Sequence, residues 1–293
     1  MIRFRCSRKS EDNTPVLRDI DIARYAQSVL YDYRPEFFRY PLYEEDFYEP
    51  ELLDPYDFAE KYLDATVDIQ HIYTDDPMEF IAGAAVFNLQ RVRVFDKVNM
   101  CTIDILVPPN TILLDNRTVH GGSKSFENFT IMHEAGHLLM HQAVYKKDPS
   151  RMFYIEGTEP ETADTSALCR RSSIGCGKGK LVTGEDFREH QANTFAASML
   201  MPPALFIPYV QSLINSTRHN YFDDELMITH TVNDGTSKYW RYRDIVKLTA
   251  EKFGVSKSAV DVQLNKYGLV AWPKEEEIYE SRRRLKMYKS LWN

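Results

Sequence analysis

The 293-residue chain contains no long apolar run and no apolar segment close to its N-terminus. Its longest apolar stretch, about Ile81 to Phe87, is far shorter than the ~20 residues that a helix needs to span a bilayer. The first residues, Met1 to Cys6, lead into polar sequence without the apolar core of a secretory signal. We therefore expect no membrane span and a cytoplasmic location.

Cysteine is also scarce, with four residues in the whole chain. Cys6 and Cys101 are isolated, and the spacing between Cys169 and Cys176 is too wide for the usual zinc-ribbon or redox pair. We expect free thiols, with a second metal site or a disulfide as the weaker alternative.

Charge is unevenly distributed along the chain, whose net charge is −7. Residues 238–293 contain 13 basic and 7 acidic residues, a net charge of +6, which leaves −13 for residues 1–237. Such asymmetry can mark an end that faces nucleic acid or a protein partner, although ordinary solvated surfaces would also explain it.

The most informative segment is His133-Glu134-Ala135-Gly136-His137, which has the pattern H-E-x-x-H. The apolar flanks predict a helix over about residues 125–143, and residues four apart on a helix share a face. Two imidazoles so placed can bind one ion, while Glu134 lies beside them and can meet a water. The alternative is a buried helix with two incidental histidines.

Zinc is the metal that this pattern favours, because a histidine pair without a redox cofactor is typical of zinc sites. A catalytic zinc takes three protein ligands and keeps one position for water. Glu134 is then the candidate general base, accepting a proton from the water and passing it to the leaving amine.

Glu189 is the best candidate for the third ligand. It lies in a predicted helix that Thr183 and Asp186 can cap and that Pro202 and Pro203 end. Glu189 shares one face with three small or apolar residues, Ala192, Ala196 and Met199. Alanines facing Gly136 would let the two helices approach closely. The alternatives are His190 as the ligand, about 100° away around the helix, or a Glu189 that is merely a surface carboxylate.

His141 continues the histidine stripe but is not expected to bind the same ion. It lies ~12 Å from His133 along a straight helix. We expect a hydrogen-bonded structural histidine there.

The two motifs together resemble the ImmA/IrrE family of metallopeptidases. Residues 133–141 read HEAGHLLMH, residues 189–202 read EHQANTFAASMLMP, and Phe129-Thr130 precedes them as in the family pattern. The resemblance covers about residues 55–215. It implies that His133, His137 and Glu189 bind zinc, that Glu134 is the catalytic base, and that the substrate is a helix-turn-helix repressor of a mobile element or stress response. Two departures are Gln191, where many members carry Glu, and the long gap of 52 positions between His137 and Glu189.

Helical and strand-like segments together predict an α+β fold, and the resemblance implies that its core is a zincin-like metallopeptidase. We expect an amphipathic helix over residues 19–31, with Ile20, Ile22, Ala26 and Leu30 as its apolar anchors. A short helix should follow from Asp54-Pro55 to about Leu63. Strands are expected over residues 67–73, 80–87, 90–95, 100–107 and 111–114.

Two segments are expected to be irregular. Residues 31–56 are crowded with aromatic, acidic and proline residues, which fits an ordered loop packed on the protein or, alternatively, a lid or docking surface. Residues 142–182 form a long insertion between the two metal motifs, either a wall or lid of the cleft or a variable loop without catalytic use.

The C-terminal part contains a second, weaker motif. Two predicted helices, over residues 243–254 and 256–268, have the turn glycine and spacing of a helix-turn-helix, with Ile245, Leu248, Phe253, Val260 and Leu264 as its core. Ser256, Lys257, Ser258 and Gln263 are expected to face outward.

We therefore divide the chain into a metallopeptidase domain over residues 1–237 and a helix-turn-helix-like segment with a basic tail over 238–293. The expected function is a zinc-dependent endopeptidase that cuts a protein regulator. The alternative is a DNA-binding regulator that uses the metallopeptidase fold as a sensing or interaction module, with salt-sensitive duplex binding.

Overall fold

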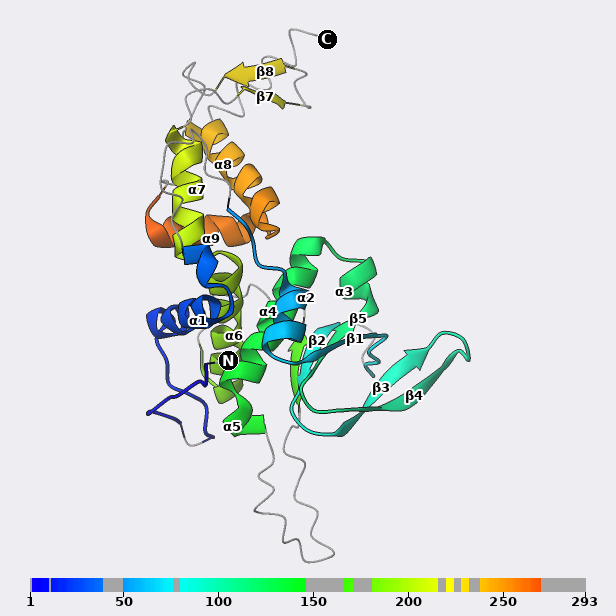
Figure 1. The fold of residues 1–293 in the computed structure, drawn as a ribbon. Helices are drawn as coiled ribbons and strands as arrows, with labels where there is room; N and C mark the ends of the chain where they lie inside the picture. The colour runs from blue at the N-terminus through cyan, green and yellow to red at the C-terminus, as the bar shows by residue number, and fades with distance from the viewer. Residues whose placement is uncertain are drawn as a thin grey trace, which may run out of the picture. The chain divides into compact units, whose positions relative to one another are not determined.

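The computed structural model of this chain describes residues 2–10, 12–38, 50–75, 80–145, 166–170, 181–215, 220–223, 228–231 and 238–269. It has mixed α+β structure, as expected (Figure 1). Contacts group the chain into two compact units, Met1–Phe38 with Leu52–Pro202, and Arg39–Glu51 with Pro203–Asn293. The segment that follows Pro202 thus belongs with the C-terminal helices, whereas the sequence-based division falls after residue 237.

A four-stranded sheet forms the centre of the first unit, in the order β1-β5-β2-β6. β1 runs parallel to β5, while β2 runs antiparallel to both β5 and β6. Every residue of β2 and β5 is buried, and apart from the two polar ends of β5, Thr111 and Asp115, these residues are apolar or glycine. The strands are β1 (Thr66–Gln70), β2 (Ile81–Val86), β5 (Thr111–Asp115) and β6 (Ser166–Arg170).

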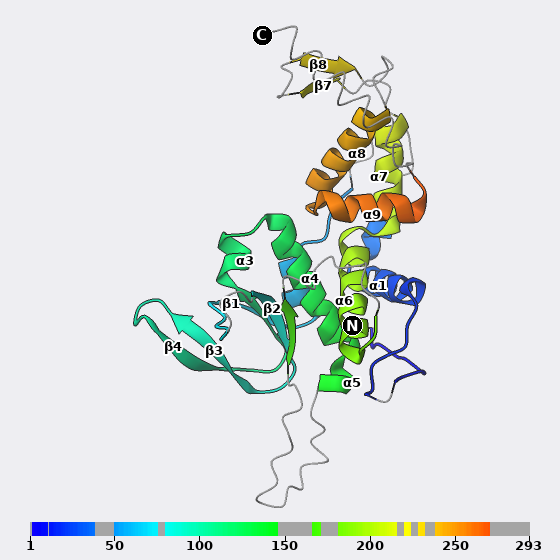
Figure 2. The same ribbon diagram turned by 180° about the vertical axis from the view of Figure 1, so that it is seen from behind.

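The remaining strands of this unit, β3 (Gln90–Asp96) and β4 (Cys101–Val107), pair as an antiparallel ribbon. This ribbon extends away from the four-stranded sheet in both views (Figures 1 and 2). An isolated bridge between Ile72 and Val94 joins β3 to the segment after β1. The expected strands over residues 80–87, 90–95, 100–107 and 111–114 are thus confirmed to within two residues, whereas the first strand ends at Gln70.

The long helices of the first unit lie on one side of the sheet. α4 packs against β2 and β5 on one side and against α6 on the other, and α1 packs on α6 (Figures 1 and 2). Short helical turns connect these elements, including a 3₁₀ turn over Pro35–Phe38 and a π-helical turn over Phe58–Tyr62 that continues α2. The helices are α1 (Asp19–Tyr33), α2 (Pro55–Asp57), α3 (Asn116–His120), α4 (Lys124–Met140), α5 (Gln142–Tyr145) and α6 (Gly184–Leu200).

Helix α1 confirms three of its four expected apolar anchors. Ile22, Ala26 and Leu30 are buried, but Ile20 is 50% exposed, so its assignment to the core was wrong. Ile20 lies two positions before Ile22, about 200° away around the helix, and it therefore points to solvent. Val29 contributes to the buried face in its place.

The insertion over residues 142–182 contains two elements that we did not expect, α5 and the edge strand β6. The remainder of this insertion, including Cys176, lies outside the described residues, as do residues 39–49 of the aromatic segment and the basic tail after residue 269. Cys6 and Cys101 are free thiols, as expected.

The second unit contains α7 (Pro203–Asn215), α8 (Lys238–Phe253), α9 (Lys257–Tyr267) and a hairpin of β7 (Asn220–Asp223) and β8 (Ile228–Thr231). Gly254 has a φ of 60° in the turn between α8 and α9, a conformation that favours glycine. The Ser256 hydroxyl caps α9 by accepting a hydrogen bond from the Ala259 N–H.

The core of this helix pair is largely as expected, since Ile245, Phe253, Val260 and Leu264 are buried. Leu248 is only partly buried. Gln263 was expected to face outward and is only 3% exposed, so this prediction was wrong. It follows Val260 by three positions and therefore shares its buried face.

Among the described residues, no single helix has both the length and the apolar character for crossing a membrane. The bent pair formed by Gly184–Leu200 and Pro203–Ile214 meets these two criteria only when both helices are taken together.

Candidate metal centre

The two histidines of the H-E-x-x-H motif lie on one face of α4. Ser123 caps this helix, its side chain accepting a hydrogen bond from the Phe126 N–H, and the helix continues unbroken to Met140. His133 and His137 are therefore one turn apart, and both side chains are completely buried. The expected helix is confirmed, although it ends at Met140 and not near residue 143.

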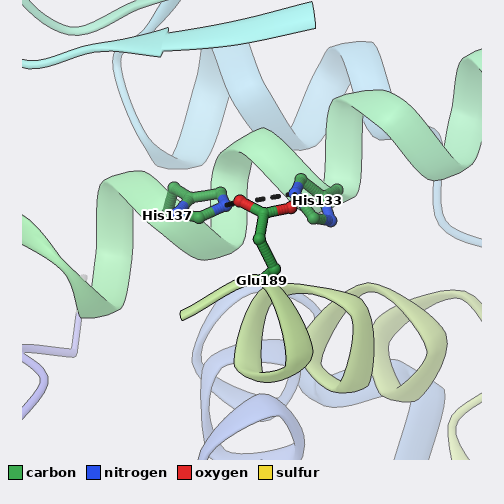
Figure 3. A group of neighbouring side chains, drawn as sticks. All are labelled: His133, His137 and Glu189. Carbon is green, nitrogen blue, oxygen red and sulfur yellow. Dashed lines mark hydrogen bonds and ion pairs between the residues drawn. The ribbon is translucent and has the colours of Figure 1, made fainter. Parts of the chain in front are cut away.

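Glu189 reaches this pair from α6, as Figure 3 shows. Thr183 and Asp186 form the expected capping box, which sets where α6 begins. One carboxylate oxygen of Glu189 lies 3.3 Å from His133 Nε2, and the other lies 3.2 Å from His137 Nε2. The two Nε2 atoms are 3.1 Å apart. The structure thus brings together the three residues that the sequence predicted as ligands, within reach of one ion.

These separations fit a tetrahedral metal site. Nitrogen and oxygen ligands that bind zinc at about 2.0–2.2 Å lie about 3.3 Å from one another in a tetrahedron. The Nε2–Nε2 distance of 3.1 Å is close to that edge, and each Nε2 atom lies 3.2–3.3 Å from a different oxygen of the Glu189 carboxylate. Two imidazoles and one carboxylate can therefore hold a metal ion and leave a fourth position for a water, although this donor set does not by itself select zinc over iron or nickel.

The close approach of α4 and α6 depends on Gly136. A Cβ atom added at Gly136 would lie 3.1 Å from Phe195 Cδ1 and 3.4 Å from the Ala192 Cα atom. Ala192 and Ala196 on the facing helix are completely buried. Small residues on both helices therefore allow the Glu189 carboxylate to reach the histidines of α4, which confirms the packing expected from the sequence.

Glu134 lies on the sheet side of α4 and is completely buried. A Cβ atom added at Gly83 of β2 would lie 3.4 Å from Glu134 Cγ and only 2.8 Å from Thr130 Cγ2. Glycine at this position of β2 thus lets α4 lie close to the sheet. The carboxylate of Glu134 does not belong to the three-residue cluster, as expected for a base rather than a ligand.

The rival third ligand, His190, points elsewhere. Its Nε2 atom lies 2.8 Å from an Asp19 carboxylate oxygen of α1, and the side chain is one third exposed. His190 follows Glu189 by one position, so a rotation of about 100° turns it away from the histidine pair. The geometry favours Glu189 over His190.

His141 also has the structural role that was expected. It is completely buried, with Nδ1 3.0 Å from His137 Nδ1 and Nε2 3.0 Å from Gln191 Oε1. It supplies no atom to the three-residue cluster. Burial lowers the pKa of His141 well below its usual value, so its ring is neutral at neutral pH.

The protonation states of His137 and Glu189 also favour binding of a cation. Burial lowers the pKa of His137, which keeps the imidazole neutral and able to donate a lone pair. Burial by itself would raise the pKa of Glu189, but its contacts with the His133 and His137 rings outweigh burial and lower the pKa. The carboxylate is therefore ionised at neutral pH.

Sequence reasoning missed Asn193, which lies 3.0 Å through Oδ1 from His133 Nδ1. Its position was a usable signal, because Asn193 follows Glu189 by four residues and so shares the face of α6 that meets α4. Both histidines of the motif therefore have a partner on the ring nitrogen that points away from the cluster.

Comparison with known proteins gives no match to this chain among family models, curated proteins or solved structures. The resemblance to the ImmA/IrrE family therefore rests on the two motifs, and what it implies is carried forward as a hypothesis.

Proposed function

We propose that this protein is a zinc-dependent endopeptidase with a zincin-like core. The observation that carries the proposal is the cluster of His133 Nε2, His137 Nε2 and the Glu189 carboxylate, in which the two Nε2 atoms lie 3.1 Å apart and each lies 3.2–3.3 Å from a carboxylate oxygen, within reach of one ion. Two histidines and one carboxylate with an open fourth position are the ligand set of catalytic rather than structural zinc.

Each residue has a role in this proposal. His133, His137 and Glu189 would hold the zinc, which would supply Lewis-acid polarisation of a water and a peptide carbonyl. Glu134, next to His133 on α4, accepts the proton of the attacking water and transfers it to the leaving amine. Its side chain is completely buried.

Strand β6 is the candidate element for holding an extended substrate. It pairs with β2 on one side only within the described residues, and it contacts α4, which carries both histidines. An unpaired strand edge can add a peptide as a further strand by main-chain hydrogen bonds. We infer a protein substrate, and the motif resemblance favours a helix-turn-helix repressor.

The test is to incubate the purified protein and zinc with a helix-turn-helix repressor encoded beside its gene, and to identify fragments by mass spectrometry. Wild type should cleave the repressor, and a chelator should stop cleavage. Glu134→Gln should retain zinc and lose at least about 100-fold in rate, the lower range of general-base contributions. The control Glu185→Gln, at an exposed position of α6, should cleave normally. Wild-type cleavage rates in Glu134→Gln would refute the assigned mechanism.

The alternative function is DNA binding through α8 and α9. The turn at Gly254 and the Ser256 cap have the layout of a helix-turn-helix, and Ser256, Lys257 and Ser258 are exposed at the start of α9. This alternative predicts duplex binding that weakens steeply with salt and survives Glu134→Gln. A lack of binding at low salt, measured by fluorescence anisotropy, would exclude it.

A further inference from the structure

The side-chain amide of Gln191 has a fixed direction in the structure. Its Nε2 atom donates a hydrogen bond of 2.7 Å to the carbonyl oxygen of Pro15, in the N-terminal segment. Because a carbonyl can only accept, the Gln191 nitrogen must point to Pro15 and its Oε1 must point the other way. Gln191 is 2% exposed and Pro15 is buried, so water does not offer an alternative arrangement.

The fixed amide determines which nitrogen of His141 carries the proton. Gln191 Oε1 lies 3.0 Å from His141 Nε2 and can only accept a hydrogen bond, so His141 must donate from Nε2. A neutral histidine has one N–H, and His141 Nδ1 is therefore an acceptor. That atom lies 3.0 Å from His137 Nδ1, which must be the donor.

The direction of these hydrogen bonds prepares His137 for a metal. With its proton on Nδ1, His137 presents the Nε2 lone pair to the cluster. His133 is arranged in the same way, because its Nδ1 lies 3.0 Å from the Oδ1 of Asn193 and donates to it. The two Nε2 atoms, which lie 3.1 Å apart, then both present lone pairs to the place where one ion would bind.

We infer that His141 and Gln191 are positioning residues of the metal site, which fix the tautomer of His137 through a hydrogen-bond relay that begins at the Pro15 carbonyl. This inference rests on the metal binding of the proposed function and names the groups that regulate it. It also explains Gln191, one of the two departures from the family pattern, since an amide can donate to Pro15 and accept from His141 together, whereas an ionised Glu carboxylate could only accept.

The N-terminal segment is anchored where the relay begins. Arg188 Nη1 donates to the Asp12 carboxylate at 2.7 Å and contacts Thr14 Oγ1 at 2.6 Å. Arg188 and Gln191 are three positions apart on α6 and thus lie on neighbouring parts of its surface. Residues 12–15 are therefore held by Arg188 and by Gln191, which flank Glu189 in the sequence. The Pro15 carbonyl connects this segment to the hydrogen bonds that reach His137.

The direct test is the protonation pattern of the histidines in the metal-free full-length protein. Long-range proton–nitrogen NMR correlations on ¹⁵N-histidine-labelled protein at pH about 8 distinguish protonated from bare ring nitrogens. We expect protons on Nδ1 of His137 and on Nε2 of His141. Finding the His137 proton on Nε2 would overturn the inference, whatever the affinity for metal.

Two substitutions of His141 separate relay from packing. His141→Asn places a side-chain amide near the position of Nδ1 and can still accept from His137, whereas His141→Phe keeps a ring of similar size without an acceptor. We expect zinc affinity, measured by competition with a chromophoric chelator, to fall about 10–100-fold in His141→Phe, as for other outer-shell partners. His141→Asn should stay within a few-fold of wild type. Equal losses in both variants would overturn the relay.

Two further measurements separate loss of the relay from loss of folding. Circular dichroism of each metal-free variant checks that it folds, and Gln191→Leu, which removes both relay contacts, should reproduce the loss seen in His141→Phe. Peptide cleavage is not used as a readout. Wild type that binds zinc with the expected tautomers but cleaves nothing would refute the proposed peptidase and leave this inference standing.

Discussion

At the residue scale, the metal cluster depends on which side of α6 a side chain occupies. Glu189 and His190 are adjacent, and both are capable ligands, yet only Glu189 faces His133 and His137. His190 instead pairs with Asp19 of α1. The sequence could rank these two residues by helical geometry, but the packing of α6 between α4 and α1 assigns each one its partner.

This assignment predicts different zinc affinities for substitutions at these two neighbouring residues. Glu189→Ala should lower zinc affinity by more than the roughly 10–100-fold that follows loss of an outer-shell partner, because a direct ligand is removed. His190→Ala, which loses only the contact with Asp19, should bind zinc as wild type does. Both affinities can be measured by chelator competition. A larger loss in His190→Ala than in Glu189→Ala would identify His190 as the ligand.

At the element scale, the site requires α4 to approach both the sheet and α6 closely. Gly83 on β2 and Gly136 on α4 make these two approaches possible. The pattern of apolar residues predicted α4 and α6 well, because each helix buries a continuous face. It did not predict β6, since a short edge strand has no distinctive sequence pattern and depends on β2 for its pairing.

Gly136→Ala should weaken zinc binding by moving α6 away from α4. Alanine would gain about 1 kcal/mol in helix propensity, but overpacking against the buried Phe195 costs about 1–3 kcal/mol, so the net effect should be destabilising. Chelator competition measures the affinity, and urea denaturation measures the free energy of unfolding.

Gly83→Ala is the matched comparison for this prediction. The new methyl group would lie 2.8 Å from Thr130 Cγ2 and 3.0 Å from the Leu113 carbonyl oxygen, so it should destabilise the fold by about 1–3 kcal/mol. It does not come between α4 and α6, and zinc affinity should change less than in Gly136→Ala. A larger loss of zinc affinity in Gly83→Ala than in Gly136→Ala would show that the α4–sheet contact, and not the α4–α6 contact, sets the ligand geometry.

At the scale of the whole molecule, a metal at this site would connect two helices that lie far apart in sequence. His133 and His137 belong to α4 and Glu189 to α6, with the insertion over residues 142–182 between them. An ion bound by all three stabilises the folded state and not the unfolded chain.

We therefore expect zinc to raise the midpoint of thermal unfolding. A free zinc concentration 100 times the dissociation constant contributes about 2.7 kcal/mol, which corresponds to a shift of roughly 5–10 °C for a unit of this size. A chelator should reverse the shift, as followed by circular dichroism. Glu189→Ala should show no shift at the same zinc concentration, and an equal shift in that variant would place the metal elsewhere.

The sequence by itself determined the α+β class and the helix that carries His133 and His137, and it ranked Glu189 above His190 as their partner. It could do so because helical periodicity is a local property that relates residues three or four positions apart. Only the tertiary structure decided the chain of contacts from Pro15 through Gln191 and His141 to His137. These residues belong to three separate segments, and the direction of their hydrogen bonds depends on packing that brings a carbonyl from the N-terminal segment against α6.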